Sequence, residues 1–492
     1  MDSNLFQLEI VGFGPVLKGS INVKPLTILI GPNNSGKSYS AKLIYSLLKA
    51  STEFPRVSQF FDKFFPNNIT PDTFITQFRK IEENVTTLKI GEDFLVPSSI
   101  IITITHKVID NYFNNNFKKE LRRIFDVDKI SSLINNTQNS IEIRTIFTDN
   151  EFKCVFKRYE FDSSESLINY SSIIIRVEKN VIGEIETKHE RDGKNLSIIL
   201  DQGAINIKNK RKELYELLRI KILNYIIDQT FGRFEIPHYY IPSGRSGIIE
   251  VQDKLISSII RNLSYNGRTK FDMVNISGII LDYLANFTQI KSHKKAKYYK
   301  LAKNFEDEII NGEIAISNIG NIPELYFNQN NMRISLSRAS STVNQLAPII
   351  VLLKYVVKQN SLIIIEEPEA HLHPKNQIIL AKYIVQMINQ GIKIILTTHS
   401  EFLLNQLSNY LLIGNLSEQK RVKILNNKGD LFLRIEDVSA YVFKDKNQNH
   451  GFFIEELPVS KTEGISDEDF LKVVDILYDE NLKINRELEG EN

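Results

Sequence analysis

The sequence feature that most constrains the fold is a glycine-rich turn between a strand-like run and a helix-like run. Residues 26–38 read LTILIGPNNSGKS, so an apolar run ends at Gly31 and four residues separate that glycine from Gly36. This GxxxxGK[ST] pattern is typical of a phosphate-binding loop, in which glycines let successive backbone N–H groups point at one phosphate. The helical periodicity of residues 38–50 places a positive helix N-terminus beside the same phosphate. The strand before the loop and the helix after it argue against a chance match.

The loop supplies the first candidate ligands for ATP and Mg²⁺. Lys37 is expected to reach the β- and γ-phosphates, and the Ser38 hydroxyl is expected to ligate Mg²⁺. The candidate nucleotide-binding residues of the loop are Gly31, Pro32, Asn33, Asn34, Ser35, Gly36, Lys37 and Ser38.

A second apolar run ends in two carboxylates. Residues 361–374 read SLIIIEEPEAHLHP, which places Glu366 and Glu367 directly after a buried strand. Charge at the end of a buried strand is costly unless an opposite charge faces it, and Mg²⁺ with a triphosphate provides that charge. Glu366 is the expected metal ligand, and Glu367 is the expected general base that deprotonates the attacking water. The alternative is a pair of surface glutamates after a strand.

A third apolar run, in GIKIILTTHS at residues 391–400, ends in a polar cluster that contains His399. Doubly wound sheets bind ligands at the carboxyl ends of their strands. His399 is therefore expected to sense the γ-phosphate, and a purely structural histidine is the alternative.

Three segments carry a family resemblance: the opening FQLEIVGFGPVLKGSINVKPLTILIGPNNSGKS, the motif EEPEAHLHP, and MRISLSRASSTVNQLAPIIVLLKY before it. Together they resemble the ABC-type ATPase heads of the SMC, RecF and OLD (overcoming lysogenization defect) families, and most closely the bacterial AAA-labelled ATPases. The resemblance covers residues 1–50 and 330–415. It implies a head-to-head dimer that closes around two ATP molecules, in which Ser340 or Ser341 contacts the γ-phosphate bound by the other subunit. His399 would occupy the switch position. His371 and His373 look like a metal pair, but the resemblance implies that they lie in the loop after the second strand.

The sequence departs from that pattern at two positions. Glu366 stands where the family usually has Asp, and the extra methylene would shift Mg²⁺ or insert a water and so slow hydrolysis. Thr342 stands where a glycine is common in the segment MRISLSRASSTVNQLAPIIVLLKY, which we call the signature segment. The family also has a glutamine loop that responds to the bound metal, and no counterpart of this loop is obvious in the sequence.

The expected fold is an α/β P-loop ABC-type ATPase head, split by a large α+β insertion and followed by a small C-terminal hairpin and helix. Residues 139–207 contain strand-like runs that suggest one antiparallel sheet, and no sustained heptads predict a coiled coil. The predicted divisions are the head at 1–50, the inserted arm at 51–329, the rest of the head at 330–435 and the C-terminal extension at 436–492.

Other stretches leave alternatives open. The loop in residues 239–250 either aims Arg245 at a phosphate or is an ordinary turn before a helix. Residues 291–303 hold six lysines with Tyr298 and Tyr299, and residues 208–212 read KNKRK; each binds nucleic acid or is a solvated helix face. From Glu455 onwards there are 12 acidic and 4 basic residues, so this end either docks a basic partner or has an acidic outer face.

The predicted function is an ATPase that acts as the regulatory sensor of a bacterial anti-phage defence system and controls a separately encoded effector. Residues after His399 lack the metal-binding Glu and strand-end DxD pair of a TOPRIM nuclease. The alternative is a RecF-like DNA-binding ATPase in repair or loading, although a net charge of +2 does not favour nucleic acid. One cysteine and no apolar run long enough to cross a membrane predict a cytoplasmic protein without a membrane partner.

Overall fold

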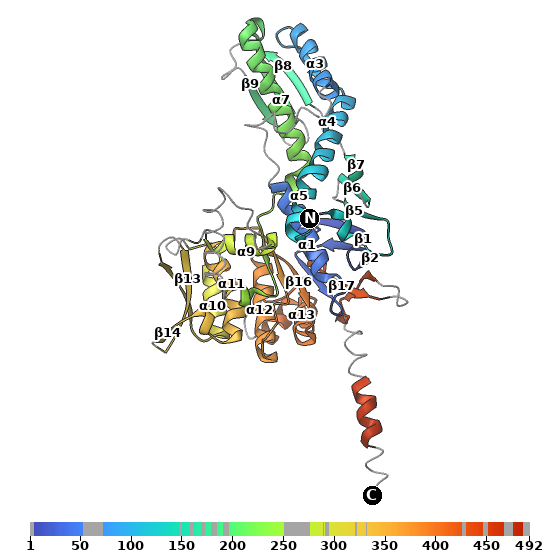
Figure 1. The fold of residues 1–492 in the computed structure, drawn as a ribbon. Coiled ribbons are helices and arrows are strands. Elements are labelled where there is room, and N and C mark those ends of the chain that lie inside the picture. The colour runs from blue at the N-terminus through green and yellow to red at the C-terminus, as the bar shows by residue number, and fades with distance from the viewer. Residues whose placement is uncertain are drawn as a thin grey trace, which may run out of the picture.

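The computed structural model describes residues 4–52, 72–146, 150–157, 161–168, 173–178, 185–189, 196–249, 276–288, 290, 295–319, 322–330, 332–425, 430–445, 451–466 and 476–485. Figure 1 shows a head with a lobe at its side, an arm that projects from the head, and a C-terminal helix at the opposite end from the arm.

The head is organised around one sheet with the strand order β11-β15-β16-β3-β17-β18-β2-β1-β5-β6-β7. The five strands from β11 to β17 are parallel to one another. Parallel strands covered on both faces are continuous apolar runs, and every residue of β3 and β15 is buried. The bounds are β11 His238–Ile241, β15 Leu362–Glu366, β16 Lys393–Thr398, β3 Leu26–Ile30, β17 Val438–Lys444, β18 Phe452–Glu456, β2 Val16–Val23, β1 Phe6–Phe13, β5 Ser140–Ile146, β6 Asn150–Lys157 and β7 Phe161–Ile168.

Helices cover both faces of the parallel strands, and the sheet separates two hydrophobic cores. Leu29 of β3 belongs to the core that contains α1, whereas Ile28 and Ile30 belong to the core that contains α11, α12 and α13. This alternation follows from the period of two in a strand. The helices are α1 Lys37–Thr52, α11 Ser341–Tyr355, α12 Pro374–Asn389 and α13 Glu401–Gly414.

The arm consists of helices packed beside a small second sheet (Figure 1). The prediction of one antiparallel sheet in the insertion is wrong, because its strands divide between two sheets. β5, β6 and β7 extend the head sheet through β1, and in the second sheet β8 and β10 are parallel. The arm elements are α3 Asp72–Thr87, β4 Asp93–Leu95, α4 Ser98–Asn111, η1 Tyr112–Phe117, α5 Lys118–Phe125, η2 Ile130–Leu133, β8 Ile173–Glu178, β9 Ile185–His189, β10 Leu196–Asp201, α6 Gln202–Asn206 and α7 Lys208–Phe231.

The lobe beside the head leads into α11. A fully buried ion pair of 2.6 Å joins Lys354 of α11 to Glu306 of α10, and both side chains have no exposed area. Because buried charges need a partner, this pair fixes α11 against α10. The elements before α11 are η3 Gly232–Phe234, α9 Gly278–Thr288, α10 Tyr299–Ile309, β12 Glu313–Ile319, β13 Ile322–Gln329, β14 Met332–Ser335 and η4 Leu336–Arg338.

The predicted C-terminal hairpin is present, but it is part of the head sheet. β17 and β18 pair antiparallel, and β17 also pairs with β3. In the helix at 476–485, Ile476, Leu477 and Tyr478 are exposed, and the earlier apolar residues of that predicted helix lie outside the described residues. The remaining elements are α14 Glu418–Ile424, η5 Ile435–Asp437, β19 Val459–Ser460 and β20 Gly464–Ile465.

The division of the chain into domains stays a prediction, although β11 lies within the predicted arm and pairs with β15 of the head sheet. None of the described helices is long and apolar enough to span a membrane.

Candidate nucleotide-binding site

The phosphate-binding loop connects the end of β3 to the first residue of α1 and has the backbone that its glycines allow. Gly31 has φ 145° and Gly36 has φ 104°, a region that side-chain-bearing residues rarely adopt. A Cβ on Gly36 would lie 2.7 Å from Cγ2 of Val16, and one on Gly31 would lie 2.9 Å from the Phe443 carbonyl oxygen. Both glycines are therefore required by conformation and by space.

The Lys37 side chain contacts the backbone of the phosphate-binding loop. Its Nζ donates to the carbonyl oxygens of Gly31 at 2.9 Å and Pro32 at 2.7 Å, and its side chain is buried. Burial lowers the pKa of Lys37 to about 8, and the nearby carboxylates of Glu367 and Glu369 act in the opposite direction. The ammonium is therefore charged at pH 7 and lies within electrostatic reach of the acidic residues after β15.

Strand register places the three predicted clusters at one edge of the sheet. β16 lies between β3 and β15, with Ile30 paired to Thr398 and Glu366 paired to Thr397. Because all three strands are parallel, the loop after Ile30, the acidic pair and His399 leave the sheet on the same side.

The Glu366 carboxylate is buried and held by the strand next to it. Its Oε1 accepts a hydrogen bond from the Tyr240 hydroxyl at 2.6 Å, and its Oε2 accepts one from the Ser243 N–H at 3.0 Å. Burial and the adjacent carboxylate raise the pKa of Tyr240, so the hydroxyl keeps its proton and remains the donor. Tyr240, the third residue of β11, is a residue of the site that no sequence pattern singles out.

Glu367 has an unusual backbone for a residue with a side chain. Its φ is 42°, a left-handed conformation that costs a non-glycine residue about 1–3 kcal/mol. Its N–H donates to the Thr397 carbonyl oxygen at 3.0 Å and faces the Thr397 hydroxyl oxygen at 3.2 Å. The side chain is half-buried, which suits a group that must meet a water molecule.

The third glutamate of the EEPE motif, Glu369, organises the start of the His399 loop. Its Oε1 accepts from the Thr398 hydroxyl at 2.7 Å and from the His399 N–H at 2.8 Å. Its Oε2 is buried and has no hydrogen-bond partner among the described residues. Burial raises the pKa of the Glu369 carboxyl, whereas burial and the Lys37 charge lower the pKa of His399. The imidazole is therefore neutral at pH 7.

The signature segment stands apart from this cluster. Ser340 is the N-cap of α11, where its hydroxyl oxygen accepts from the Val343 N–H at 3.4 Å, and Ser340 and Ser341 are exposed. No hydrogen bond among the described residues joins either serine to the phosphate-binding loop of its own chain.

The loop in residues 239–250 contains the predicted turn before a helix, because residues 243–244 form a turn and residues 245–249 are helical. Arg245 is fully buried, and its guanidinium donates to the carbonyl oxygens of Glu366 at 2.8 Å and Glu367 at 3.0 Å. His373 also has a local role, because its Nδ1 accepts from the Lys375 N–H at the start of α12.

The donors at this edge fit Mg²⁺ that is held jointly with a nucleotide. Among the described residues, no group of three His, Cys, Asp or Glu side chains could hold a metal by itself. Mg²⁺ is usually bound by one or two carboxylates together with substrate phosphates. Each oxygen of Glu366 accepts one hydrogen bond and keeps a further lone pair, and Ser38 supplies a hydroxyl in the first turn of α1.

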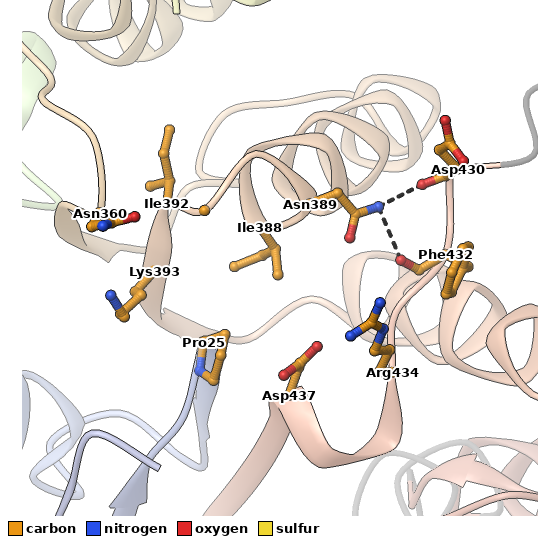
Figure 2. Close-up of a pocket in the computed structure, with 11 residues that line it drawn as sticks. Pro25, Asn360, Ile388, Asn389, Ile392, Lys393, Asp430, Phe432, Arg434 and Asp437 are labelled. Atoms are coloured by element: carbon orange, nitrogen blue, oxygen red, sulfur yellow. Dashed lines mark hydrogen bonds between the residues drawn. The ribbon is translucent and has the colours of Figure 1, made fainter. Parts of the chain in front are cut away.

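A hollow lies at the opposite end of these strands, where β3 and β16 begin (Figure 2). It has a volume of about 460 Å³ and includes Pro25, Lys393 and Asp437. Asn389 on its wall donates to the Asp430 and Phe432 carbonyl oxygens. It is at the amino ends of the strands, at the opposite end from the phosphate-binding loop.

The family model described as AAA ATPase domain matches residues 4–404 of the chain. The chain belongs to this ATPase family. The protein is accordingly an ATPase with an α/β P-loop head, and the fold and activity predicted from the sequence are confirmed. No curated protein matches this family member.

Three solved structures of SMC heads are similar to this ATPase. The SMC head bound to the C-winged helix domain of ScpA has 10% identity and a TM-score of 0.41, covering 92% of this chain and 97% of that chain. The SMC head domain from Thermotoga maritima has 9% identity and a TM-score of 0.35, covering 92% and 98%. The Smc head with an extended coiled coil, bound to the C-terminal domain of ScpA derived from Pyrococcus furiosus, has 11% identity and a TM-score of 0.36, covering 96% and 98%.

Proposed function

We propose that this ATPase is the regulatory sensor of a bacterial anti-phage defence system, in which two heads close around ATP and Mg²⁺ and thereby control a separately encoded effector. The proposed closure of the heads is supported by one observation: two parts of the site lie apart from each other within one chain. Lys37, Glu367 and His399 lie within electrostatic reach of one another, whereas Ser340 and Ser341 are exposed at the start of a helix. A helix N-terminus favours a phosphate, so the serines of one subunit would complete the site of the other.

The proposed mechanism assigns one task to each residue. The Lys37 ammonium and the loop N–H groups bind the phosphates, and Glu367 accepts a proton from the attacking water. Neutral His399 orients the γ-phosphate through a ring N–H. Mg²⁺ bound by Ser38, Glu366 and the phosphates would supply charge neutralisation on the phosphate oxygens. Hydrolysis removes the γ-phosphate that both subunits contact, so the heads separate.

The defence role rests on the sequence resemblance carried by EEPEAHLHP and on two further features. The net charge is +2, which gives no general attraction to nucleic acid. The C-terminal helix exposes Ile476, Leu477 and Tyr478 within an acidic segment, which supports a protein partner at this end. These features favour a protein effector over DNA.

The alternative, a RecF-like DNA-binding ATPase, draws on the lysines of residues 291–303. Lys295 and Lys297 are exposed, but Tyr298 is buried and Lys303 pairs with Asp307 at 3.1 Å. Burial of Tyr298 removes one surface for stacking a base and the ion pair of Lys303 removes one contact to a phosphate, whereas Lys300 of α10 is exposed. Residues 291–294 lie outside the described part of the chain.

The experiment that tests the proposed function uses tagged Glu367→Gln protein expressed in the native host, purified with ATP and Mg²⁺. We expect one protein in fixed proportion to the ATPase, and we expect the same preparation from Lys37→Ala cells to lack it. Deletion of its gene should abolish protection against phage. Salt-sensitive DNA without a protein partner would instead support the RecF-like alternative.

A further inference from the structure

We propose that Arg245 is a positioning residue for hydrolysis: with Thr397 on the opposite side, it holds the backbone of Glu367 in the conformation that aims the general base. This inference rests on the proposed role of Glu367.

The surroundings of Arg245 are unusual for a buried charge. The side chain has no exposed area, and each bond that it makes is to a backbone carbonyl. The acceptors are the oxygens of Gln345 at 2.9 Å, Pro242 at 3.1 Å, Glu366 at 2.8 Å, Glu367 at 3.0 Å and Pro368 at 3.4 Å. These five bonds match the five N–H donors of a guanidinium. Burial lowers the pKa of Arg245 to about 10, so it remains charged at pH 7.

Three of these acceptors are consecutive carbonyls that flank the catalytic side chain. Glu366, Glu367 and Pro368 contribute them, so Arg245 binds the peptide groups on both sides of the Glu367 Cα. From the neighbouring strand, the Thr397 carbonyl oxygen accepts a hydrogen bond from the Glu367 N–H at 3.0 Å, and the Thr397 hydroxyl oxygen lies 3.2 Å from the same nitrogen. A residue at φ 42° relaxes unless its surroundings hold it. Arg245 and Thr397 supply that restraint.

Residues 240–246 also hold the Glu366 carboxylate and α11. Tyr240 and Ser243 bind the Glu366 carboxylate, while Arg245 binds the Gln345 carbonyl oxygen of α11. The Gln345 side chain in turn donates to the Ser246 hydroxyl at 3.3 Å. A lysine could not replace Arg245, because an ammonium has three donors and no planar fork.

A double-mutant cycle tests the inference by steady-state ATP hydrolysis, measured as kcat and KM, in wild type, Arg245→Lys, Glu367→Gln and the combined variant. We expect Arg245→Lys to lower kcat at least tenfold and to change KM for ATP by less than about twofold. In the Glu367→Gln background, Arg245→Lys should cause no further loss, because Arg245 acts through Glu367. A structural role would lower the rate by the same factor in both backgrounds.

The matched control is Arg123→Lys. Arg123 is partly buried and pairs with Glu120 at 2.7 Å and Asp282 at 2.6 Å, in the α5–α9 contact. We expect this control to change kcat by less than twofold, even where the thermal midpoint falls. An equal loss of kcat in both arginine variants would overturn the positioning role.

If Arg245→Lys does not fold, the same double-mutant cycle is measured with Thr397→Val in place of Arg245→Lys. This variant removes only the hydroxyl oxygen that faces the Glu367 N–H and leaves the guanidinium in place. We expect a two- to fivefold lower kcat in wild type and no loss in the Glu367→Gln background; an unchanged kcat in wild type would contradict the restraint. Wild-type hydrolysis by Glu367→Gln itself would instead overturn the proposed base.

Discussion

The hydroxyl of Tyr240 in β11 donates a 2.6 Å hydrogen bond to Oε1 of Glu366 in the adjacent strand β15. Both side chains are buried, and the two strands are parallel neighbours at the end of the sheet. A residue 126 positions earlier in the chain thereby orients the proposed metal ligand.

Tyr240→Phe removes this donor and leaves the ring packing in place. Partners of metal ligands typically contribute 10–100-fold to metal affinity. We expect the half-saturating Mg²⁺ concentration for hydrolysis to rise about tenfold or more, with kcat at saturating Mg²⁺ nearly unchanged. The measurement is a Mg²⁺ titration of the steady-state rate, with Tyr239→Phe as the control because the Tyr239 hydroxyl donates to the Val356 carbonyl oxygen instead. An unchanged titration curve would mean that Tyr240 does not orient a metal ligand.

The pH dependence of ATP binding should report Lys37. Burial lowers its pKa to about 8 in the free protein, so the ammonium loses its proton as the pH rises through that value. Phosphates bind the charged form, and we expect the Kd for ATP to rise about tenfold per pH unit above pH 8. Isothermal titration calorimetry from pH 6.5 to 9.5 checks this expectation. Lys37→Arg, which stays protonated, should bind weakly with a flat profile; a parallel slope in that variant would assign the titration to another group.

Glu369→Ala should affect the His399 loop more than the overall fold. It leaves the Thr398 hydroxyl and the His399 N–H without their acceptor, which costs about 1–3 kcal/mol for a buried group. We expect a lower thermal midpoint and a kcat reduced about as far as in His399→Ala. The combined variant should be no slower than His399→Ala alone. Multiplied losses in the combined variant would show that Glu369 acts independently of His399.

Lys354→Met should destabilise the head, because it removes the fully buried partner of Glu306 and leaves that carboxylate with the partly exposed Lys303 ammonium at 3.1 Å as its remaining ion pair. Removing one member of a buried ion pair costs about 3–5 kcal/mol. Replacing both members, in Lys354→Met with Glu306→Leu, should recover most of that loss. Chemical denaturation of the three proteins gives the free energies. Equal stability of the single and double variants would show that the uncompensated charge is not the cause.

The sequence predicted those parts of the site that are made by local patterns. β3, β15 and β16 are visible because a buried parallel strand is a continuous apolar run, and the loop after β3 needs glycines at fixed spacing. The acidic pair and His399 stand at the carboxyl ends of β15 and β16. Register then brings the three clusters to one edge, as expected for a parallel sheet.

Other parts depend on contacts between distant segments and have no local pattern. Arg245 binds backbone carbonyls, which every residue carries, so its partners leave no trace in the sequence. Glu369 was within a recognised motif, and its place three residues after Glu366 was the available signal. β5 pairs with β1 of the head sheet although alternation within β5 cannot specify a partner strand.

The proposed function requires that ATP closes two heads through the exposed serines at the start of α11. The most direct test is the mass of Glu367→Gln protein in solution, measured by light scattering with ATP and Mg²⁺ and again with ADP. We expect twice the 56.7 kDa chain mass with ATP and a smaller species with ADP, and we expect no such increase when Ser340 and Ser341 are both replaced by Arg. The same mass with both nucleotides, or ATP-dependent association that survives the serine replacements, would contradict the proposed closure.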